Sequence, residues 1–395
     1  MIVEEIRDHA SLLAIRPEWA ALAERVSSRN PFITPQFMLP YLDHIGTRYD
    51  CRVLVARENA RMIGLSPTFM RRRRRPGLRI RRISFPTHGT SPPLEIVVED
   101  GREDVMVAFV EYWKASRDWD LIELQNVPTT SSTEAMLRAA VSPARLLLSS
   151  VQHRTSLYVP IEGTWDDYWR SIPKKSRAAG KRASRLCSEA GELQVLSYPA
   201  DITDIGQAIA WIVDITRRSW KSADDAAAQD DRMATFLTEL AAGGLLDICF
   251  VTISGRAVAY LINVLYKRQL NAYHTAYDLE HMPRGPAVLL LQHSISECFR
   301  RGYPIYDLLG EHQLHVRRWA STYVQYSDLR ITRDKPVARL RAEVYCRLRD
   351  WRVRRARRFT DEQKIEAKNA ARAQRTGIGT EPPDPGAGGG ADTAE

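Results

Sequence analysis

The chain has 395 residues, of which 44% are hydrophobic and 27% charged, and its formal net charge is +9. This length exceeds one ordinary domain, and this composition excludes a disordered or fibrous chain. The charge does not indicate a nucleic-acid-binding body, because residues 331–375 hold 15 Lys/Arg and 6 Asp/Glu, the last 20 residues hold four acids and no base, and residues 1–330 carry only +4.

The sequence predicts neither a transmembrane helix nor a signal peptide. No window approaches the roughly 18 uncharged apolar residues of a membrane span, and the first residues show no apolar core of a signal peptide. The cysteines are odd in number, widely spread and without a CxxC pair: Cys51, Cys187, Cys249, Cys298 and Cys346. We therefore expect reduced thiols, a cytoplasmic protein and no metal site.

The first half, residues 1–150, shows alternating apolar residues in short runs separated by turn residues. The runs predict an order of β-turn-β followed by β-α-β, in which Val105, Phe109 and Trp113 share one face of the helix. The predicted elements are strands at 51–57, 62–69, 94–98 and 120–124 and a helix at about 103–116.

The second half, residues 151–335, repeats this order. Strands are predicted at 246–253, 257–265, 269–277 and 303–309, with a helix at about 286–300 before the last of them. The recurrence indicates an internal duplication and hence two domains of α/β (α+β) class.

A helical insert at 164–242 separates these two sets of elements. Thr164 is predicted to be an N-cap, since acids follow it in the first turn. Further helices are predicted at 174–190, 202–220 and 233–242. The first of these is basic along one face, which is either solvated, or covers an acceptor cleft, or contacts phosphates.

Two other basic segments allow alternative interpretations. Arg71–Arg75 forms the tip of a predicted hairpin, which is explained by solvation, although an anionic lipid, a lipid-linked acceptor or, least favoured, a nucleic acid would also suit it. Residues 336–375 predict a basic amphipathic helix with an apolar stripe at Leu340, Val344, Leu348 and Trp351. It either docks on the body, as its interspersed acids favour, or lies on an anionic inner leaflet. Residues 376–395 are predicted to be disordered.

The segment 276–290 carries the clearest chemical signal. A strand ends, a turn carries Arg284 and Gly285, and Pro286 opens a helix. Backbone N–H groups at a helix N-terminus bind phosphate, glycine permits close approach, and arginine adds a fixed positive charge. An ordinary strand-to-helix loop explains the same pattern without function.

With the run Arg301–Asp307 and Gly310, this segment resembles the GNAT superfamily, and more closely its FemAB-related branch of CelD-type acetyltransferases. The resemblance covers about residues 20–330 and implies two tandem GNAT-like domains with mixed twisted sheets, the first degenerate. The chain departs from the branch where Leu314 and His315 replace a usual Tyr-Lys pair, and where Gly285-Pro286 replaces Pro-Gly.

The resemblance implies an acyl-CoA donor, with no metal. Its pyrophosphate is expected on the turn from Arg284 to Ala287, so the expected cofactor-binding residues are Tyr277, Arg284, Gly285 and Ala287. Backbone N–H groups near the end of strand 269–277 are expected to polarise the thioester carbonyl. The candidate acid/base residues are His274, Asp307, Glu311 and His315.

Three functions remain open at this level. The first is transfer of an acyl group, in particular acetyl, to an amine or hydroxyl of a saccharide or small molecule in bacterial polysaccharide or envelope biosynthesis. The second is a FemAB-like transferase that takes its acyl group from aminoacyl-tRNA. The third is a catalytically inactive binding or scaffold protein, which the missing Tyr-Lys pair and the N–H that Pro286 lacks both favour.

Overall fold

The computed structural model describes residues 1–45, 49–71, 80–86, 92–219, 231–309, 318–320, 322–336, 340–348 and 351. Met1–Tyr345 forms one compact unit and Cys346–Glu395 a second. Within the described residues, no helix is both long and apolar enough to cross a bilayer. All five cysteines are unpaired and all but Cys51 are buried, so they serve as small core residues.

The first half of the larger unit begins with a strand and three α-helices that the apolar pattern did not predict. The predicted helix at 103–116 is confirmed, with Val105, Phe109 and Trp113 buried. The predicted strand 94–98 is reduced to its last two residues. In chain order the elements are β1 (Ile2–Ile6), α1 (His9–Ala14), α2 (Arg16–Arg25), η1 (Pro31–Ile33), α3 (Pro35–Ile45), β2 (Tyr49–Cys51), β3 (Val53–Glu58), β4 (Arg61–Ser66), β5 (Phe69–Arg71), β6 (Arg82–Ser84), β7 (Val97–Val98), α4 (Glu103–Ala115), β8 (Leu121–Pro128) and α5 (Thr133–Val141).

The second half follows its prediction closely in the strands that are bounded by turn residues. Thr164 caps its helix as expected, in a capping box with Asp167. The elements are β9 (Leu146–Pro160), α6 (Trp165–Ser171), α7 (Lys174–Ser188), β10 (Leu193–Tyr198), α8 (Ile205–Arg217), α9 (Asp231–Ala242), β11 (Leu246–Ile253), β12 (Arg256–Tyr266), β13 (Gln269–Tyr277), η3 (Met282–Arg284), α10 (Pro286–Arg301), β14 (Ile305–Asp307) and β15 (Thr322–Arg333). Strands β11 and β13 match the predicted bounds, whereas β9, β10 and β15 were not predicted.

Two basic segments lie mainly outside the described part of the chain. Of Arg71–Arg75, only the backbone of Arg71 is described, at the end of β5. Residues 340–348 are helical, in agreement with the predicted basic helix, and the predicted tail at 376–395 also falls outside the description.

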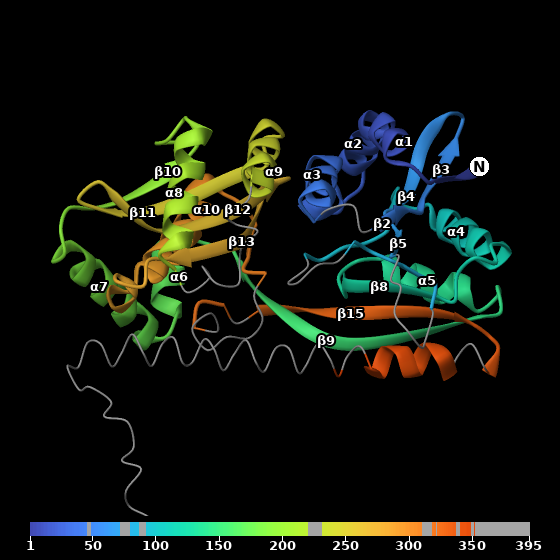
Figure 1. Cartoon of the computed structure of the whole chain (residues 1–395). Coiled ribbons are helices and arrows are strands. Elements are labelled where there is room, and N and C mark those ends of the chain that lie inside the picture. The colour runs from blue at the N-terminus through green and yellow to red at the C-terminus, as the bar shows by residue number, and fades with distance from the viewer. Residues whose placement is uncertain are drawn as a thin grey trace, which may run out of the picture. The chain divides into compact units, whose positions relative to one another are not determined.

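The strands form two sheets. A small sheet has the order β1-β3-β4-β7, and a large one has the order β10-β11-β12-β13-β14-β9-β15-β8-β6-β5-β2. Strand β15 pairs antiparallel with β9 from Thr322–Tyr158 to Arg333–Leu146, and its other edge pairs with β8. Figure 1 shows β9 and β15 running side by side. A strand from the end of the unit therefore joins the sheet of the first half to that of the second.

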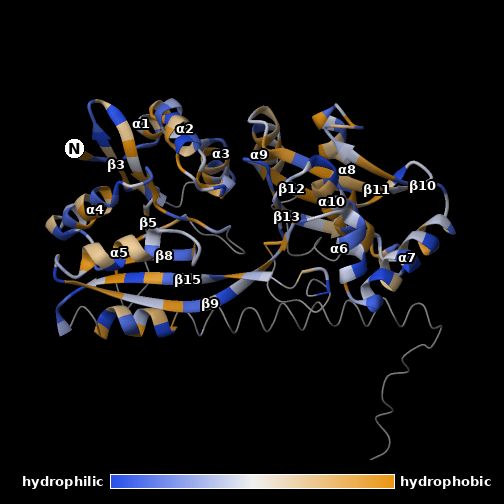
Figure 2. Ribbon diagram, turned by 180° about the vertical axis from the view of Figure 1, so that it is seen from behind, coloured by the Kyte–Doolittle hydropathy of each residue, from blue (hydrophilic) through white to orange (hydrophobic). Residues whose placement is uncertain are grey.

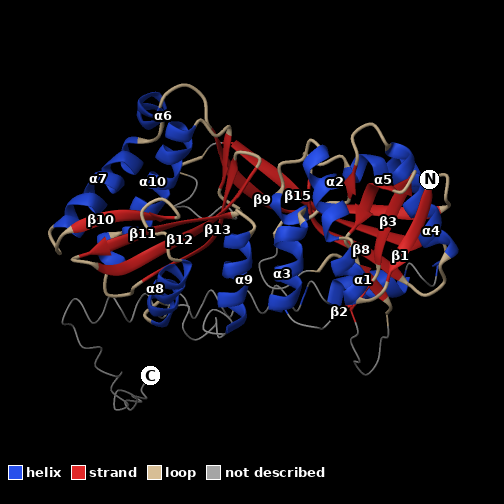
Figure 3. Ribbon diagram, turned by 90° about the horizontal axis from the view of Figure 1, so that it is seen from above, coloured by secondary structure: helices blue, strands red, loops and turns tan. Residues whose placement is uncertain are grey.

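Helices cover both faces of β10 to β13. Helices α7 and α10 lie on one side and α8 and α9 on the other (Figure 3). Apolar residues of β11 and β12 divide between two hydrophobic clusters, one with α7 and α10 and one with α8 and α9. Helix α7 carries hydrophilic residues along its length in the hydropathy view (Figure 2). Its small buried residues, Ser176, Gly180, Ala183 and Cys187, form the packed stripe.

A buried ionic cluster lies where β15 joins the first half. Glu123 on β8 is fully buried, and its carboxylate accepts from Arg82 Nη1 at 2.7 Å and from Arg330 Nε at 3.0 Å. Arg82 lies on β6 and Arg330 on β15, so one carboxylate ties three strands together. Such a cluster is costly to break because removal of one partner leaves buried charges uncompensated.

We predict that Glu123→Ala lowers the free energy of unfolding by about 3–5 kcal/mol, the usual loss when one partner of a buried ion pair is removed. Urea denaturation followed by circular dichroism measures it. Glu111→Ala is the control, because Glu111 pairs with Lys114 at 3.1 Å on the surface of α4, where a pair contributes about 0–1 kcal/mol. Equal losses for the two variants would contradict the prediction.

Candidate active site

The two parallel strands β13 and β14 pair over a short length and then separate. Their register runs only from Gln269–Ile305 to Asn271–Asp307, where β14 ends, while β13 continues to Tyr277. The other edge of β14 pairs with β9 over the same three residues. Beyond Asp307, β13 therefore pairs with no described strand on that edge.

A β-bulge lies at the start of this unpaired stretch. Ile262 of β12 pairs with His274, but the next residue, Asn263, pairs with Ala272, so Tyr273 is an extra residue in β13. Ala272 packs in the cores beside α7 and α10, whereas Tyr273 and Ala276 pack on the α8 and α9 side. Strict alternation would place Ala272, His274 and Ala276 on one face, and the bulge changes this arrangement.

His274 is half-buried on β13 and is oriented by a chain of hydroxyl groups. Thr216 Oγ1 donates to Ile212 O at 2.7 Å, so it accepts from Tyr260 Oη, which lies 3.0 Å away. Tyr260 Oη is also 3.0 Å from His274 Nδ1, and with its own hydrogen committed it accepts there. Neutral His274 is therefore held with the hydrogen on Nδ1 and the lone pair on Nε2, the state that a proton acceptor needs.

Asp307 closes β14 and is nine-tenths buried. Its Oδ1 accepts from Ser156 Oγ at 2.9 Å and from the Leu309 N–H at 2.8 Å, whereas Oδ2 has no hydrogen-bond partner among the described residues. Burial raises the pKa of this carboxyl above its usual range, against the opposing effect of those two hydrogen bonds. A buried aspartate with one uncommitted oxygen can take up a proton.

At the start of α10, few backbone N–H groups remain for an anion. The N–H groups of Arg284 and Gly285 donate within the preceding turn at 3.0 and 3.1 Å, Pro286 has none, and the Val288 N–H donates to Gly285 O at 2.9 Å. The Ala287 N–H has no acceptor within the described part of the chain. The phosphate site predicted from the sequence therefore has one uncommitted amide at its centre.

Gly285, Arg284 and Tyr277 are the other predicted donor-binding residues at this junction. Gly285 has φ +75°, and an added Cβ there would lie 3.5 Å from Ala183 Cβ, so glycine fits both the left-handed turn and the contact with α7. The Arg284 guanidinium donates to Glu280 O at 3.2 Å and forms no ion pair with a described residue. Tyr277 is half-buried and packs against the hydrophobic cluster that includes Leu289 and Leu290 of α10.

The loop between β13 and η3 gathers metal-type ligands. Asp278, Glu280 and His281 place ligand atoms within 4.8 Å of one another. Asp278 already pairs with Arg218, and the pKa of His281 is lowered by burial and by the nearby charge of Arg284. Because these cations already neutralise the cluster, it is a weak match for a metal ion.

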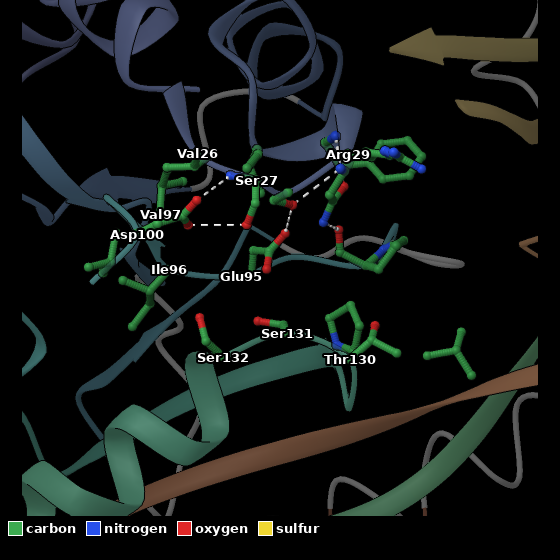
Figure 4. Close-up of a pocket in the computed structure, with 18 of the residues that line it drawn as sticks. Val26, Ser27, Arg29, Glu95, Ile96, Val97, Asp100, Thr130, Ser131 and Ser132 are labelled. Atoms are coloured by element: carbon green, nitrogen blue, oxygen red, sulfur yellow. Dashed lines mark hydrogen bonds between the residues drawn. The ribbon is translucent and has the colours of Figure 1, made fainter. Parts of the chain in front are cut away.

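A cavity of about 520 Å³ lies beside Asp307. Its lining comes from within segments 26–33, 93–103 and 128–136 of the first half and from strands β9, β13, β14 and β15. Figure 4 shows Glu95 and the Thr130–Ser132 loop lining it. Asp307 belongs to the lining, whereas His274, Tyr277, Arg284, Gly285 and Ala287 do not. Asp307 is thus the predicted site residue that faces the cavity from the point where β13 and β14 separate.

Two of the predicted acid/base residues, Glu311 and His315, lie outside the described residues, as do Gly310 and Leu314.

The sequence comparison agrees with this geometry. Residues 174–320 match the family described as acetyltransferase (GNAT) domain. This segment is similar to GNAT acetyltransferase domains. The chain is accordingly an enzyme of the acyltransferase class, and the matched segment includes α7, the separating strands and α10. No curated protein matches the chain by sequence.

Solved structures share the fold over most of the chain. FemX has a TM-score of 0.58 at 11% identity, covering 85% of this chain and 99% of FemX. A conserved protein of unknown function from Bacteroides thetaiotaomicron has a TM-score of 0.55 at 12% identity, covering 84% and 100%. The C-terminal domain of a putative lysylphosphatidylglycerol synthetase from Agrobacterium fabrum has a TM-score of 0.51 at 10% identity, covering 82% and 93%. The predicted fold class, α/β with two GNAT-like domains and mixed sheets, is confirmed.

Several residues in and around the cavity were not predicted from the sequence. Glu95 lies inside the apolar run 94–98 that was predicted to be a strand, and a carboxylate within such a run was a signal that could have been used. Ser156 and Tyr158 belong to β9, in which the polar residues between Ser149 and Ser156 hid the strand. Only folding brings Ser156 into hydrogen-bond contact with Asp307, and Glu95 and Tyr158 into the lining of the same cavity.

We predict that neutral His274 carries its hydrogen on Nδ1, and that Tyr260→Phe removes this preference because the accepting hydroxyl is lost. Long-range ¹H–¹⁵N spectra of the imidazole measure the tautomer. Tyr266→Phe is the matched control. Tyr266 lies on the same β12–β13 hairpin as His274, but its hydroxyl donates to Ala23 O of α2. An Nε2–H tautomer in the wild-type protein would contradict the prediction.

Proposed function

We propose that the chain transfers an acyl group from acyl-CoA to an amine or hydroxyl of a saccharide or small-molecule acceptor, with Asp307 as the general base. The acceptor occupies the cavity of about 520 Å³, and the donor extends along the unpaired end of β13 towards the start of α10. The acceptor class, with its place in bacterial polysaccharide or envelope biosynthesis, rests on the resemblance to the CelD-type branch.

One observation carries this proposal: Asp307 stands at both the cavity and the separation of β13 from β14. In a GNAT domain with separating strands, the acyl carbon and the acceptor must meet at that point. The Oδ2 atom of Asp307 has no partner among the described residues, so it is able to accept a proton there. A base in this position contributes on the order of 10²–10⁴-fold to the rate.

The reaction is a direct displacement. The acceptor nitrogen or oxygen attacks the thioester carbonyl carbon, and Asp307 takes the proton that the nucleophile loses. Collapse of the tetrahedral state breaks the carbon–sulfur bond, and the thiolate of CoA leaves and is then protonated. Backbone N–H groups of β13 near the bulge at Tyr273 support the proposal, because amides aimed at the developing oxyanion stabilise that state most.

The donor contacts follow from the junction before α10. Ala287 supplies an uncommitted N–H and Arg284 a guanidinium without an ion-pair partner in the described part of the chain. Since Pro286 has no N–H and the N–H groups of Gly285 and Val288 are committed, the pyrophosphate would depend on Arg284 more than on backbone amides. Tyr277 and Gly285 would border the pantetheine and the turn.

A second candidate function uses aminoacyl-tRNA as donor. Helix α7 packs against η3 and α10 and exposes Lys174, Lys175, Lys181 and Arg182, none of which has an ion-pair partner among described residues. An unneutralised basic face beside the donor site suits a nucleic acid. The fold shared with FemX does not decide between the two donors.

We predict that acetyl-CoA raises the melting temperature of the full chain, and that Arg284→Glu abolishes the rise because a like charge meets the pyrophosphate. Arg300→Glu is the control, because Arg300 lies on the same helix but is exposed and paired with Glu297. Differential scanning fluorimetry measures both variants.

The tRNA alternative predicts a different outcome of the same comparison. Acetyl-CoA would then have no effect, and the chain would bind aminoacyl-tRNA with an affinity that falls steeply with salt. Lys181→Glu together with Arg182→Glu would weaken that binding. A chain that responds to neither donor would contradict both functions.

We predict that Asp307→Asn lowers kcat by about 10²–10⁴-fold, with little change in acetyl-CoA binding. The base works only when ionised, and burial raises its pKa, so the wild-type rate rises with pH above the usual range of aspartate. The variant lacks this acid limb. Asp120→Asn, a surface change beside Arg81, should keep both the rate and the pH profile.

A further inference from the structure

The cavity beside Asp307 holds more acid than its arginines can neutralise. Of its lining residues, Glu99 pairs with Arg25 and Arg61 outside the lining, and Arg102 is already paired with Glu58 and Asp104. The charged lining residues are Arg29, Glu95, Glu99, Asp100, Arg102, Glu103 and Asp307. The unneutralised negative charge in the cavity therefore favours a cationic ligand.

Among the acidic lining residues from the first half of the chain, Glu95 is the one that is buried. Only 8% of the residue is exposed, and it forms no ion pair with a described residue. Its Oε1 accepts from Ser28 Oγ at 2.6 Å, and its Oε2 has no hydrogen-bond partner in the described part of the chain. A carboxylate taken out of water without a cation destabilises the protein, unless a ligand supplies the cation.

The backbone on both sides of Glu95 is fixed. The Leu94 N–H donates to Asn126 O at 3.3 Å, and the Ile96 N–H donates to Thr133 Oγ1 at 3.2 Å. Asn30 Nδ2 donates to Pro93 O at 3.2 Å, which ties the Ser28 turn to the loop that carries Glu95. The carboxylate therefore stands in place before any ligand arrives, and its hydroxyl partner is held with it.

We propose that Glu95, oriented by Ser28, is a cation subsite that selects an acceptor carrying an ammonium group. The inference rests on the proposed function, in which this cavity receives the acceptor. The ammonium keeps its charge and donates to Glu95 Oε2, while a second amine or hydroxyl of the same molecule meets Asp307. The acceptor class is thereby narrowed to amino sugars, diamines and related amino compounds.

The experiment compares amines with isosteric alcohols by isothermal titration of the full chain without an acyl donor. The pairs are D-glucosamine with D-glucose and 1,4-diaminobutane with 1,4-butanediol. We expect the amine of at least one pair to bind about tenfold or more tightly than its alcohol, because a desolvated carboxylate strongly prefers a charged donor. No preference in either pair overturns the inference.

Variants locate the preference. Glu95→Gln has nearly the same shape and should abolish the preference for amines, and Ser28→Ala should weaken it. Glu103→Gln removes an exposed acid of the same lining and should leave it intact. If Glu95→Gln melts like the wild type and keeps the preference, the subsite is not at Glu95 and the inference fails.

The outcome is separable from that of the proposed function. Since no acyl donor is present, the titration reports only on acceptor recognition, whereas protection by acetyl-CoA and the Asp307→Asn rate report only on transfer. Transfer that depends on Asp307 with no preference for amines would leave the acyltransferase and remove the cation subsite.

Discussion

The position of β15 between β9 and β8 is the constraint on which the rest of the structure depends. This strand carries the sheet from one half to the other, and Arg330 on it shares the buried carboxylate of Glu123. Strand β9 is held along its length by β15, and its far end holds β14. Ser156, which bonds to Asp307, lies on the segment of β9 that β15 fixes. The place of Asp307 therefore depends on β15, although β15 does not pair with β14.

The cavity wall of the first half is held by a different contact. The hairpin of β12 and β13 ends at Lys267, whose Nζ donates to Ala23 O at 2.8 Å and Val26 O at 2.6 Å at the end of α2. Val26 begins the segment that lines the cavity and leads to Ser28. The strand that presents Gln269 and Asn271 to the cavity is thus anchored, at its start, to the segment of the first half that lines the same cavity.

The elements that could be predicted are those whose own residues, apolar side chains, turn residues and caps, match the place that the element takes in the fold. Strands β11 and β13 follow from apolar runs bounded by turn residues, and the N-cap at Thr164 follows from the acids after it. Strand β9 did not, because its Ser149 and Ser150 interrupt the alternation. Pairing with β15 supplies its stability from about 170 residues further along the chain, and such long-range pairing has no local signal. For the site, Asp307 was predicted as a candidate, but its partner Ser156 and the facing Glu95 are brought to it only by folding.

The bulge at Tyr273 has a consequence for how this strand can change during evolution. A single-codon deletion of Tyr273 would restore strict alternation and leave Ala272 opposite Asn263 and His274 opposite Ile262, so neither residue would change its face. A second deletion in the strand would shift the pairing by one residue and exchange the faces of His274 and Tyr277, and no substitution of either residue would reverse that exchange. Descendants of this chain can therefore lose the one extra residue of the strand, but no more, and keep the arrangement of its side chains.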